Sequence, residues 1–170
     1  MAVDEGLAAR AWGDDSFTDF YRDRRDRVAR ALVVTLGDTD LGAEAADEAM
    51  ARAYQRWSRV SVLDNPAGWV YRVGLNWGTS TLRRRHRAPD PSADGPPEPP
   101  GPADPDVLAA VAELDVRQRA VVVCRYLLGW SEADTAAALD TPVGTVKSRL
   151  HRASRRLAAR LAHLAPGGLA

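Results

Sequence analysis

The chain has 170 residues, and its 23 lysines and arginines are balanced by 23 aspartates and glutamates, so its formal net charge is zero. Its composition is 45% apolar and 27% charged, which is typical of a soluble globular protein. No apolar run is long enough to span a bilayer, the acidic N-terminus does not resemble a signal peptide, and a single cysteine excludes an intramolecular disulfide. These features predict a cytoplasmic protein without membrane insertion.

The zero net charge is the sum of strongly charged segments. Residues 1–65 carry 13 acids and 9 bases, residues 66–87 carry 5 bases and no acid, residues 88–115 carry 7 acids and no base, residues 116–140 are balanced, and residues 141–170 carry 6 bases and no acid. Solvated helix faces usually mix signs, because like charges at i and i+4 destabilise a helix. The two purely basic segments therefore predict two sites for an anionic partner.

Proline marks a boundary within the acidic segment. Eight of the eleven prolines lie between Pro89 and Pro105, where the chain can form neither a helix nor a central strand. We expect an extended, acidic linker over residues 88–105 between two domains, at residues 1–87 and 106–170. At about 3.1 Å per residue, such a linker reaches on the order of 60 Å.

The first domain has helical periodicity, and no long segment alternates at the strand period. Three helices are expected, over residues 16–36, 41–57 and 66–85. Ser16 begins a capping box for the first helix, Asp40 can cap the second, and Asn65 followed by Pro66 starts the third.

The second domain is also predicted to be helical. Four helices are expected, over residues 106–114, 116–128, 132–139 and 142–164. Asp115 and Ser131 begin capping boxes, and Thr141 before Pro142 repeats the cap-plus-proline start. A tight turn at residues 140–141 joins the last two helices in a helix-turn-helix layout. The chain is thus predicted to be all-α, with two small helical domains.

The last helix has an apolar stripe and a basic opposite side. The stripe, which we expect to be core, consists of Val143, Val146, Leu150, Ala153, Leu157 and Leu161. The opposite side carries groups that suit phosphates or base edges, namely Lys147, Ser148, His151, Arg152 and Arg155, with Arg149 on a flank. Gly144 would allow close approach of another backbone. A solvated basic helix is the alternative, but the lack of acids and the preceding turn favour DNA recognition.

The first basic segment ends the third helix, with the sequence LRRRHR at residues 82–87. Cations at a helix C-terminus are stabilised by the helix dipole, which is a purely structural explanation. The same helix carries Arg72, Asn76, Trp69 and Trp77, and interleaved basic and aromatic residues suit unstacked, single-stranded bases. For the two tryptophans a core role is the better interpretation.

Residues with catalytic chemistry are sparse. Cys124 lies in the apolar run VVVCRYLL and is expected to be a core residue. The three histidines have no metal-ligand spacing, and neither a nucleophile–base pair nor a phosphate-binding glycine loop is present. We therefore expect no enzymatic activity, no catalytic residue, no metal, no cofactor and no small-molecule substrate.

Several stretches together carry a family resemblance. They are AEAADEAMARAYQRW at residues 43–57, NPAGWVYRVGLNWGTSTLRRR at 65–85, LDVRQRAVVVCRYLLGWSEADTAAAL at 114–139 and VGTVKSRLHRA at 143–153. The chain resembles the group IV, extracytoplasmic-function (ECF) sigma factors of bacterial RNA polymerase, and in particular the actinobacterial sigma-E type. The resemblance implies a sigma region 2 helical bundle at residues 1–87 and a sigma region 4 helix-turn-helix at residues 106–170.

The resemblance also implies roles for individual residues. The second helix would bind core RNA polymerase through Glu44, Asp47 and Glu48, although the apolar pair usual in the family is alanine here. The loop at residues 58–65 would hold a flipped base of the −10 element. The residues implied in −10 binding are Arg72, Asn76, Arg83, Arg84 and Arg85. The residues implied in −35 binding are Lys147, Ser148, Arg149, His151 and Arg152, to which the helical wheel adds Arg155.

The implied function is that of an alternative sigma factor, which binds core RNA polymerase and directs promoter-specific transcription initiation. Its partners would be core polymerase, promoter DNA and, as a further candidate, an anti-sigma factor. The linker would join elements roughly 17 base pairs apart, about 58 Å, either as a mimic of nascent RNA or as a simple spacer. Two other interpretations stay open: a conventional helix-turn-helix regulator, which explains the second domain only, and a polymerase-binding adaptor, which explains the first only.

Overall fold

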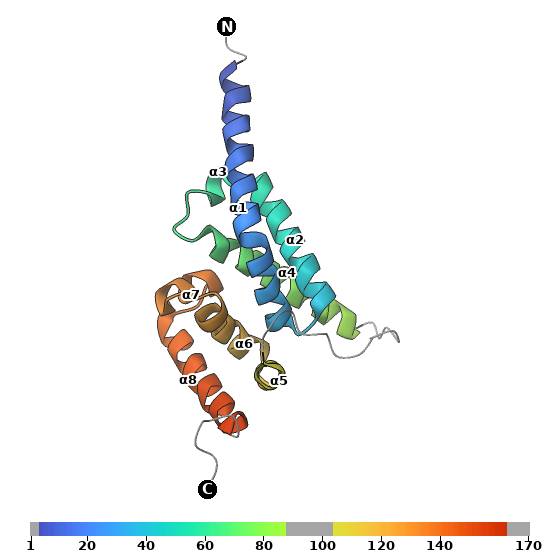
Figure 1. Ribbon diagram of the computed structural model, residues 1–170, viewed down its shortest axis with the longest axis vertical. Coiled ribbons are helices and arrows are strands. Elements are labelled where there is room, and N and C mark those ends of the chain that lie inside the picture. Colours follow the sequence, from blue (N-terminus) through green and yellow to red (C-terminus); the bar gives the residue numbers. More distant parts are fainter. Residues whose placement is uncertain (1–3, 88–103, 163–170) are drawn as a thin grey trace.

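The computed structural model describes residues 4–87 and 104–162, and these ranges contain helices and connecting turns but no strands, as predicted (Figure 1). The first unit consists of α1 (Asp4–Leu36), α2 (Thr39–Gln55), the short α3 (Trp57–Val60) and α4 (Pro66–Arg87). The second consists of α5 (Pro105–Ala112), α6 (Val116–Val122), the π-helical turn η1 (Val123–Leu127), α7 (Glu132–Leu139) and α8 (Val143–Arg160). Most of the expected linker, residues 88–103, lies outside the described residues.

The helix α1 begins earlier than the sequence predicted. It runs without interruption through Ser16, so the expected capping box there is wrong. The residues before Ser16 include alanine, leucine and arginine, which favour helix, and the helix therefore needs no new start at that serine. The Ser16 hydroxyl instead accepts a hydrogen bond from the Trp57 indole at 3.3 Å. In Figure 1, α1 extends beyond the other helices of the first unit.

The helix α2 packs closely along α1. Its N-cap is Asp38 and not the predicted Asp40, because the Asp38 carboxylate accepts a hydrogen bond from the Leu41 amide at 2.8 Å. A Cβ on Gly42 would lie 2.5 Å from both the Cα and the backbone nitrogen of Val33. Only glycine at this position lets the two backbones approach so closely.

The core of the first unit lies between α1, α2 and α4. Its largest fully buried side chains are Val28, Leu32, Leu41, Met50, Val60, Val70 and Tyr71. Trp69 and Trp77 are partly buried against this core, which confirms their expected role. The Asn65 cap is also confirmed, since its side chain accepts a hydrogen bond from the Gly68 amide at 2.9 Å.

The second unit has the predicted helix-turn-helix. The Ser131 capping box of α7 is confirmed, and Asp140 forms the tight turn in the left-handed conformation, with φ of 48°. The expected Thr141 cap of α8 is wrong: the Thr141 hydroxyl donates to the Leu139 carbonyl at 3.0 Å, and no side chain caps α8. The expected helix over residues 116–128 is α-helical only to Val122 and then widens into η1.

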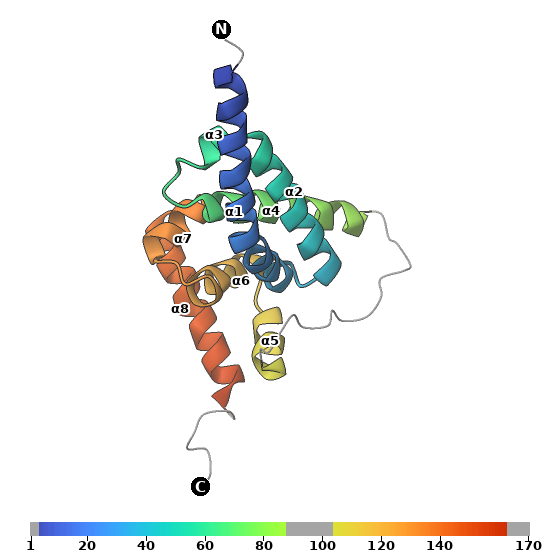
Figure 2. The ribbon, with the colours of Figure 1, turned by 45° about the horizontal axis from the view of Figure 1, so that its top comes forward.

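The two units pack against each other. The turn η1 and α6 contact α1, while α7 contacts α4 (Figure 2). Val123, Cys124 and Leu128 of the second unit are buried in the same apolar cluster as the core of the first. The sequence indicated two domains but gave no sign that they share a core.

No helix within residues 4–87 and 104–162 combines the length and the apolar character needed to cross a bilayer.

Two glycine variants test the contact between α1 and α2. Gly42→Ala should lower the free energy of unfolding by about 2–3 kcal/mol, because its new methyl group meets backbone atoms that cannot move aside. Gly144→Ala is the matched control, since a Cβ there meets nothing within 4 Å; it should be neutral or stabilising by up to about 1 kcal/mol. Urea unfolding measures both, and equal effects would contradict the packing described.

Candidate nucleic-acid interface

The inner side of α8 anchors the helix to the rest of the second unit. Val146 and Ala153 are fully buried, and Leu150 and Leu157 pack against the same clusters. The predicted stripe is therefore confirmed at these positions. Two positions differ: Val143 begins the helix and remains 40% exposed, and Leu161 follows the last residue of α8 and is only partly buried.

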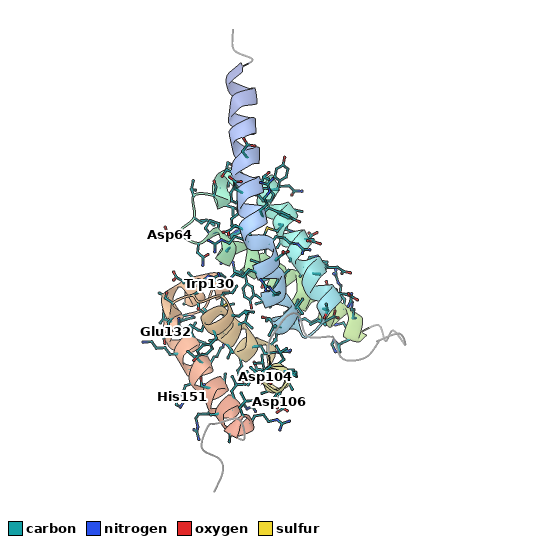
Figure 3. The ribbon with its side chains drawn as sticks, in the orientation of Figure 1. Asp64, Asp104, Asp106, Trp130, Glu132 and His151 are labelled. Carbon is teal, nitrogen blue, oxygen red and sulfur yellow. The ribbon has the colours of Figure 1, made fainter. Side chains whose placement is uncertain are left out.

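The outer side of α8 presents the basic side chains. Lys147, His151, Arg152 and Arg155 are exposed, while Ser148 and Arg149 are partly buried. His151 lies on the side of α8 that faces away from the first unit (Figure 3). The Lys147 ammonium is 3.7 Å from the Glu132 carboxylate of α7, a partner that the sequence analysis did not identify.

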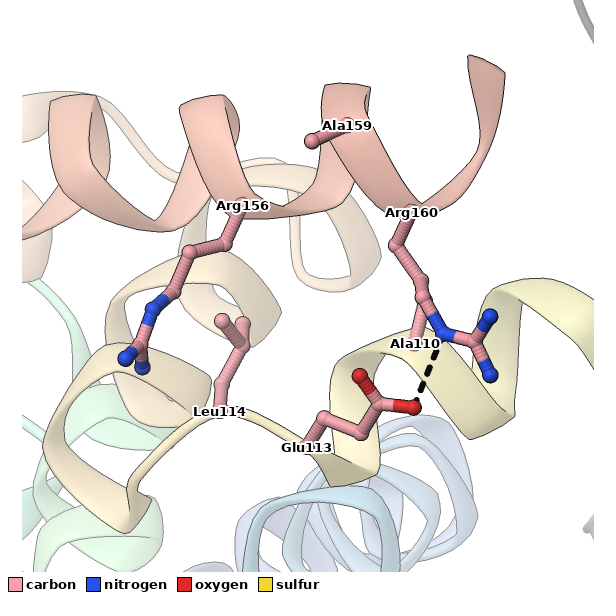
Figure 4. A pocket seen from close by; sticks show the side chains of 6 residues that line it. All are labelled: Ala110, Glu113, Leu114, Arg156, Ala159 and Arg160. Atoms are coloured by element: carbon pink, nitrogen blue, oxygen red, sulfur yellow. Dashed lines mark hydrogen bonds and ion pairs between the residues drawn. The ribbon is translucent and has the colours of Figure 1, made fainter. Parts of the chain in front are cut away.

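Two further arginines of α8 turn back onto the second unit. Arg156 donates to the Gln118 side-chain oxygen at 3.3 Å, and Arg160 donates to the Glu113 carboxylate at 2.9 Å. Both line a hollow of about 420 Å³ between α5 and α8 (Figure 4). Both arginines remain exposed, but these contacts direct their guanidinium groups toward α6 and the end of α5.

A second basic surface lies at the C-terminal end of α4. Arg83, Arg84 and Arg85 are exposed there, and so is Asn76, whereas Arg72 is partly buried. The Arg85 guanidinium lies 3.3 Å from the Asp38 carboxylate and 4.0 Å from that of Glu44.

The loop before α4 exposes apolar side chains. Val62 is 79% exposed and Leu63 is 42% exposed. Sequence reasoning predicted a base-binding loop at residues 58–65 but did not single out these two. An apolar pair inside a short polar loop was the signal that could have identified them.

The three acids expected to bind polymerase lie on α2, and each has an arginine partner. Glu44 and Asp47 are exposed and Glu48 is partly buried. Asp47 pairs with Arg25 at 2.7 Å and Glu48 with Arg52 at 2.7 Å. The hydrogen bond to Asp47 is the main cause of the raised pKa of Arg25. The basic partners of these acids were not predicted from the sequence.

The structure keeps the two basic surfaces apart. The helix α7 packs against both α4 and α8, so α4 and α8 lie on different sides of it. Within residues 4–87 and 104–162, no cluster of three or more histidine, cysteine or acidic side chains could hold a metal ion.

The comparison with known proteins identifies the family. The family model for sigma-70, region 4 matches residues 106–157, which include α5 to α7 and most of α8. The ECF RNA polymerase sigma factor SigM of Mycobacterium tuberculosis is 32% identical over 169 residues, which cover 96% of this chain and 86% of SigM. The chain belongs to the ECF RNA polymerase sigma factors. It therefore functions in promoter-directed transcription initiation, as the sequence resemblance implied.

Other relatives support the sigma-E resemblance and the fold. The RNA polymerase sigma-E factor of Streptomyces coelicolor is 32% identical over 147 residues, with 83% of each chain covered. The sigma factor RpoE, solved in complex with the anti-sigma factor NepR from Bartonella quintana, has a TM-score of 0.73 at 22% identity, over 86% of this chain and 97% of RpoE. CnrH, solved with the cytosolic domain of CnrY, has a TM-score of 0.63 at 21% identity, over 94% of this chain and 97% of CnrH. A stand-alone helix-turn-helix regulator would account for the second unit only, whereas the match to SigM spans both units of this sigma factor.

The buried Cys124 of the sigma factor gives a prediction of pH dependence. Burial raises the pKa of its thiol from 9.0 to about 12, so the unfolded chain loses this proton at lower pH than the folded one. The protonated thiol stabilises the fold fully below pH 9, and this stabilisation is lost between pH 9 and 12. The free energy of unfolding should fall there with a slope approaching about 1.4 kcal/mol per pH unit.

Urea unfolding between pH 9 and 10 tests this expectation. Cys124→Ala should remove the thiol's contribution to the pH dependence of the free energy of unfolding. The loss of buried packing should also lower that free energy by the same amount at every pH. An unchanged slope in the variant would show that other groups cause the alkaline loss.

Proposed function

We propose that this sigma factor binds core RNA polymerase through its first unit and reads promoter DNA with two separate basic surfaces. The observation that carries the proposal is the exposed basic side of α8, opposite a buried apolar stripe in a helix-turn-helix. A helix held in this way can enter the major groove of B-DNA.

The −35 element would be read by α8. Lys147, His151, Arg152 and Arg155 are exposed and can reach phosphates or base edges. Ser148 and Arg149 are also assigned to this surface, although their partial burial restricts their reach.

The −10 element would be bound by α4 and the loop before it. Arg83, Arg84 and Arg85 would hold phosphates, together with Arg72, and Asn76 would approach a flipped base. Flipping a base costs a few kcal/mol of unstacking. The exposed Val62 and Leu63 would offset part of this cost by covering the base with apolar surface.

Core polymerase would bind the acids of α2: Glu44, Asp47 and Glu48. The solved complex of the sigma factor RpoE with the anti-sigma factor NepR supports an anti-sigma factor as a further partner. We assign region 2 to residues 1–87, the acidic linker to residues 88–105 and region 4 to residues 106–170. The protein would act in the cytoplasm and would catalyse no reaction of its own.

Reconstituted transcription tests the proposed function. The chain, mixed with core polymerase and genomic DNA fragments, should produce transcripts from defined start sites, which sequencing of their 5′ ends would locate. Core polymerase alone is the control. The proposal fails if no fragment yields a start site that depends on this chain.

Variants of two arginines of α8 distinguish recognition of DNA bases from contacts within the protein. Arg152→Ala should reduce discrimination between matched and mismatched −35 duplexes by about 1–3 kcal/mol, because an exposed arginine there can pair with a base edge. Arg156→Ala is the control, since Arg156 contacts Gln118 instead, and it should leave discrimination unchanged. Competition binding measures both. Equal losses on all duplexes for Arg152→Ala would make it a phosphate contact only.

A further inference from the structure

One acidic side chain of α7 reaches the basic side of α8. The Glu132 carboxylate lies 3.7 Å from the Lys147 ammonium, and the two side chains are 36% and 61% exposed. Figure 3 shows Glu132 along the same outer edge of the second unit as His151. The surface assigned to the −35 element therefore includes a carboxylate, although residues 141–170 contain no acid.

The first turn of α7 does not need Glu132 for its capping. The Ser131 hydroxyl accepts a hydrogen bond from the Asp134 amide at 3.0 Å, and it donates to the Asp134 carboxylate at 2.6 Å. Glu132 takes no part in this capping box. An acid at this position is also stabilised by the helix dipole, but that effect does not require Lys147. The Glu132–Lys147 pair is therefore an additional feature of this surface.

Lys147 differs from the other exposed cations on this side of α8. Within the ranges that the structure describes, neither Arg152 nor Arg155 has an acidic partner, whereas Lys147 has Glu132. The two arginines can contact a phosphate directly. Lys147 must first give up its carboxylate or share its charge with it, so its contact with a phosphate is less favourable.

A carboxylate has opposite effects at the two parts of DNA that a helix can contact. Phosphate groups are negatively charged and repel it. Base edges in the major groove present N–H donors on cytosine and adenine, which a carboxylate can accept. The Lys147 ammonium has three donors, so it can keep Glu132 on one of them and donate another to guanine O6 or N7. The Glu132–Lys147 pair is thus compatible with base edges and unfavourable at the backbone.

We propose that Glu132 is a specificity-determining residue for the −35 element, because it makes Lys147 a better ligand for base edges than for phosphates. This inference rests on the proposed function. Sequence-independent affinity comes from phosphate contacts, so weakening one of them lowers binding to arbitrary DNA more than binding to the matched element. Since exposed ion pairs are weak, the gain in selectivity is several-fold at most.

Removal of the carboxylate tests the inference. The full chain and its Glu132→Gln variant are titrated with a matched −35 duplex, taken from a start site found by reconstituted transcription, and with a scrambled duplex of the same composition. At about 50 mM salt, Glu132→Gln should bind the scrambled duplex about three- to fivefold more tightly and the matched duplex less than about twofold more tightly. On the scrambled duplex alone, the slope of log K against log salt should steepen by about 0.9, because the released Lys147 adds one phosphate contact.

Two further variants separate this effect from a general change of charge. Glu113→Gln is the matched control, because Glu113 also pairs with a cation of α8, Arg160, at 2.9 Å, but at the hollow beside α5. It should leave both affinities unchanged. In a Lys147→Gln background, Glu132→Gln should leave the salt slope unchanged, since no lysine is released to neutralise a phosphate. Urea unfolding confirms that each variant is folded.

Two outcomes would overturn the inference. If Glu132→Gln tightens binding to both duplexes equally, Glu132 only repels DNA and does not contribute to selectivity. If neither affinity changes, Lys147 exchanges its partner freely. Both results leave the proposed function standing. The role proposed for α8 fails separately if the natural chain does not prefer the matched duplex to the scrambled one.

Discussion

The structure depends on an apolar core that neither helical unit completes alone. Val123, Cys124 and Leu128 of the second unit are buried among the core residues of the first, and Val34 of α1 packs against a cluster formed by the second. Small domains bury a low fraction of their surface, and each unit here is well below one hundred residues. Fully burying one aliphatic side chain contributes about 1.5–3 kcal/mol, so a few shared residues are a large part of the stability of such small units.

Local features of the fold could be predicted because they depend on neighbouring residues alone. The Ser131 capping box, the Asn65 cap and the turn at Asp140 need only a side chain and a backbone group a few positions away. Predictions failed where two local solutions compete. Asp38 and Asp40 are both acceptable caps for α2, and the structure uses Asp38. Thr141 can bond either forward to α8 or back to Leu139, and it bonds back.

In the candidate site, too, the features that depend on neighbouring residues could be predicted and those that depend on distant residues could not. Helical spacing separates the buried Val146 and Ala153 from the exposed Arg152 and Arg155, so the basic side of α8 follows from the sequence. The ion pairs do not, because Lys147–Glu132 and Arg25–Asp47 join different helices. The packing of α7 on α4 is likewise a long-range contact, and charge patterns contain no information about it.

Some of the acids and bases that cancel in the zero net charge are paired with each other in the structure. Acids partner two of the cations assigned to DNA, Lys147 and Arg85. Exposed pairs of this kind contribute about 0–1 kcal/mol each, so a phosphate or a polymerase side chain can replace either partner at little cost. The contact between the two units is different, because Thr35, Tyr71 and Cys124 are fully buried there. Separating the two units would expose the apolar surface of Val123, Cys124 and Leu128. Separating the units therefore costs more free energy than exchanging the partners of the exposed ion pairs.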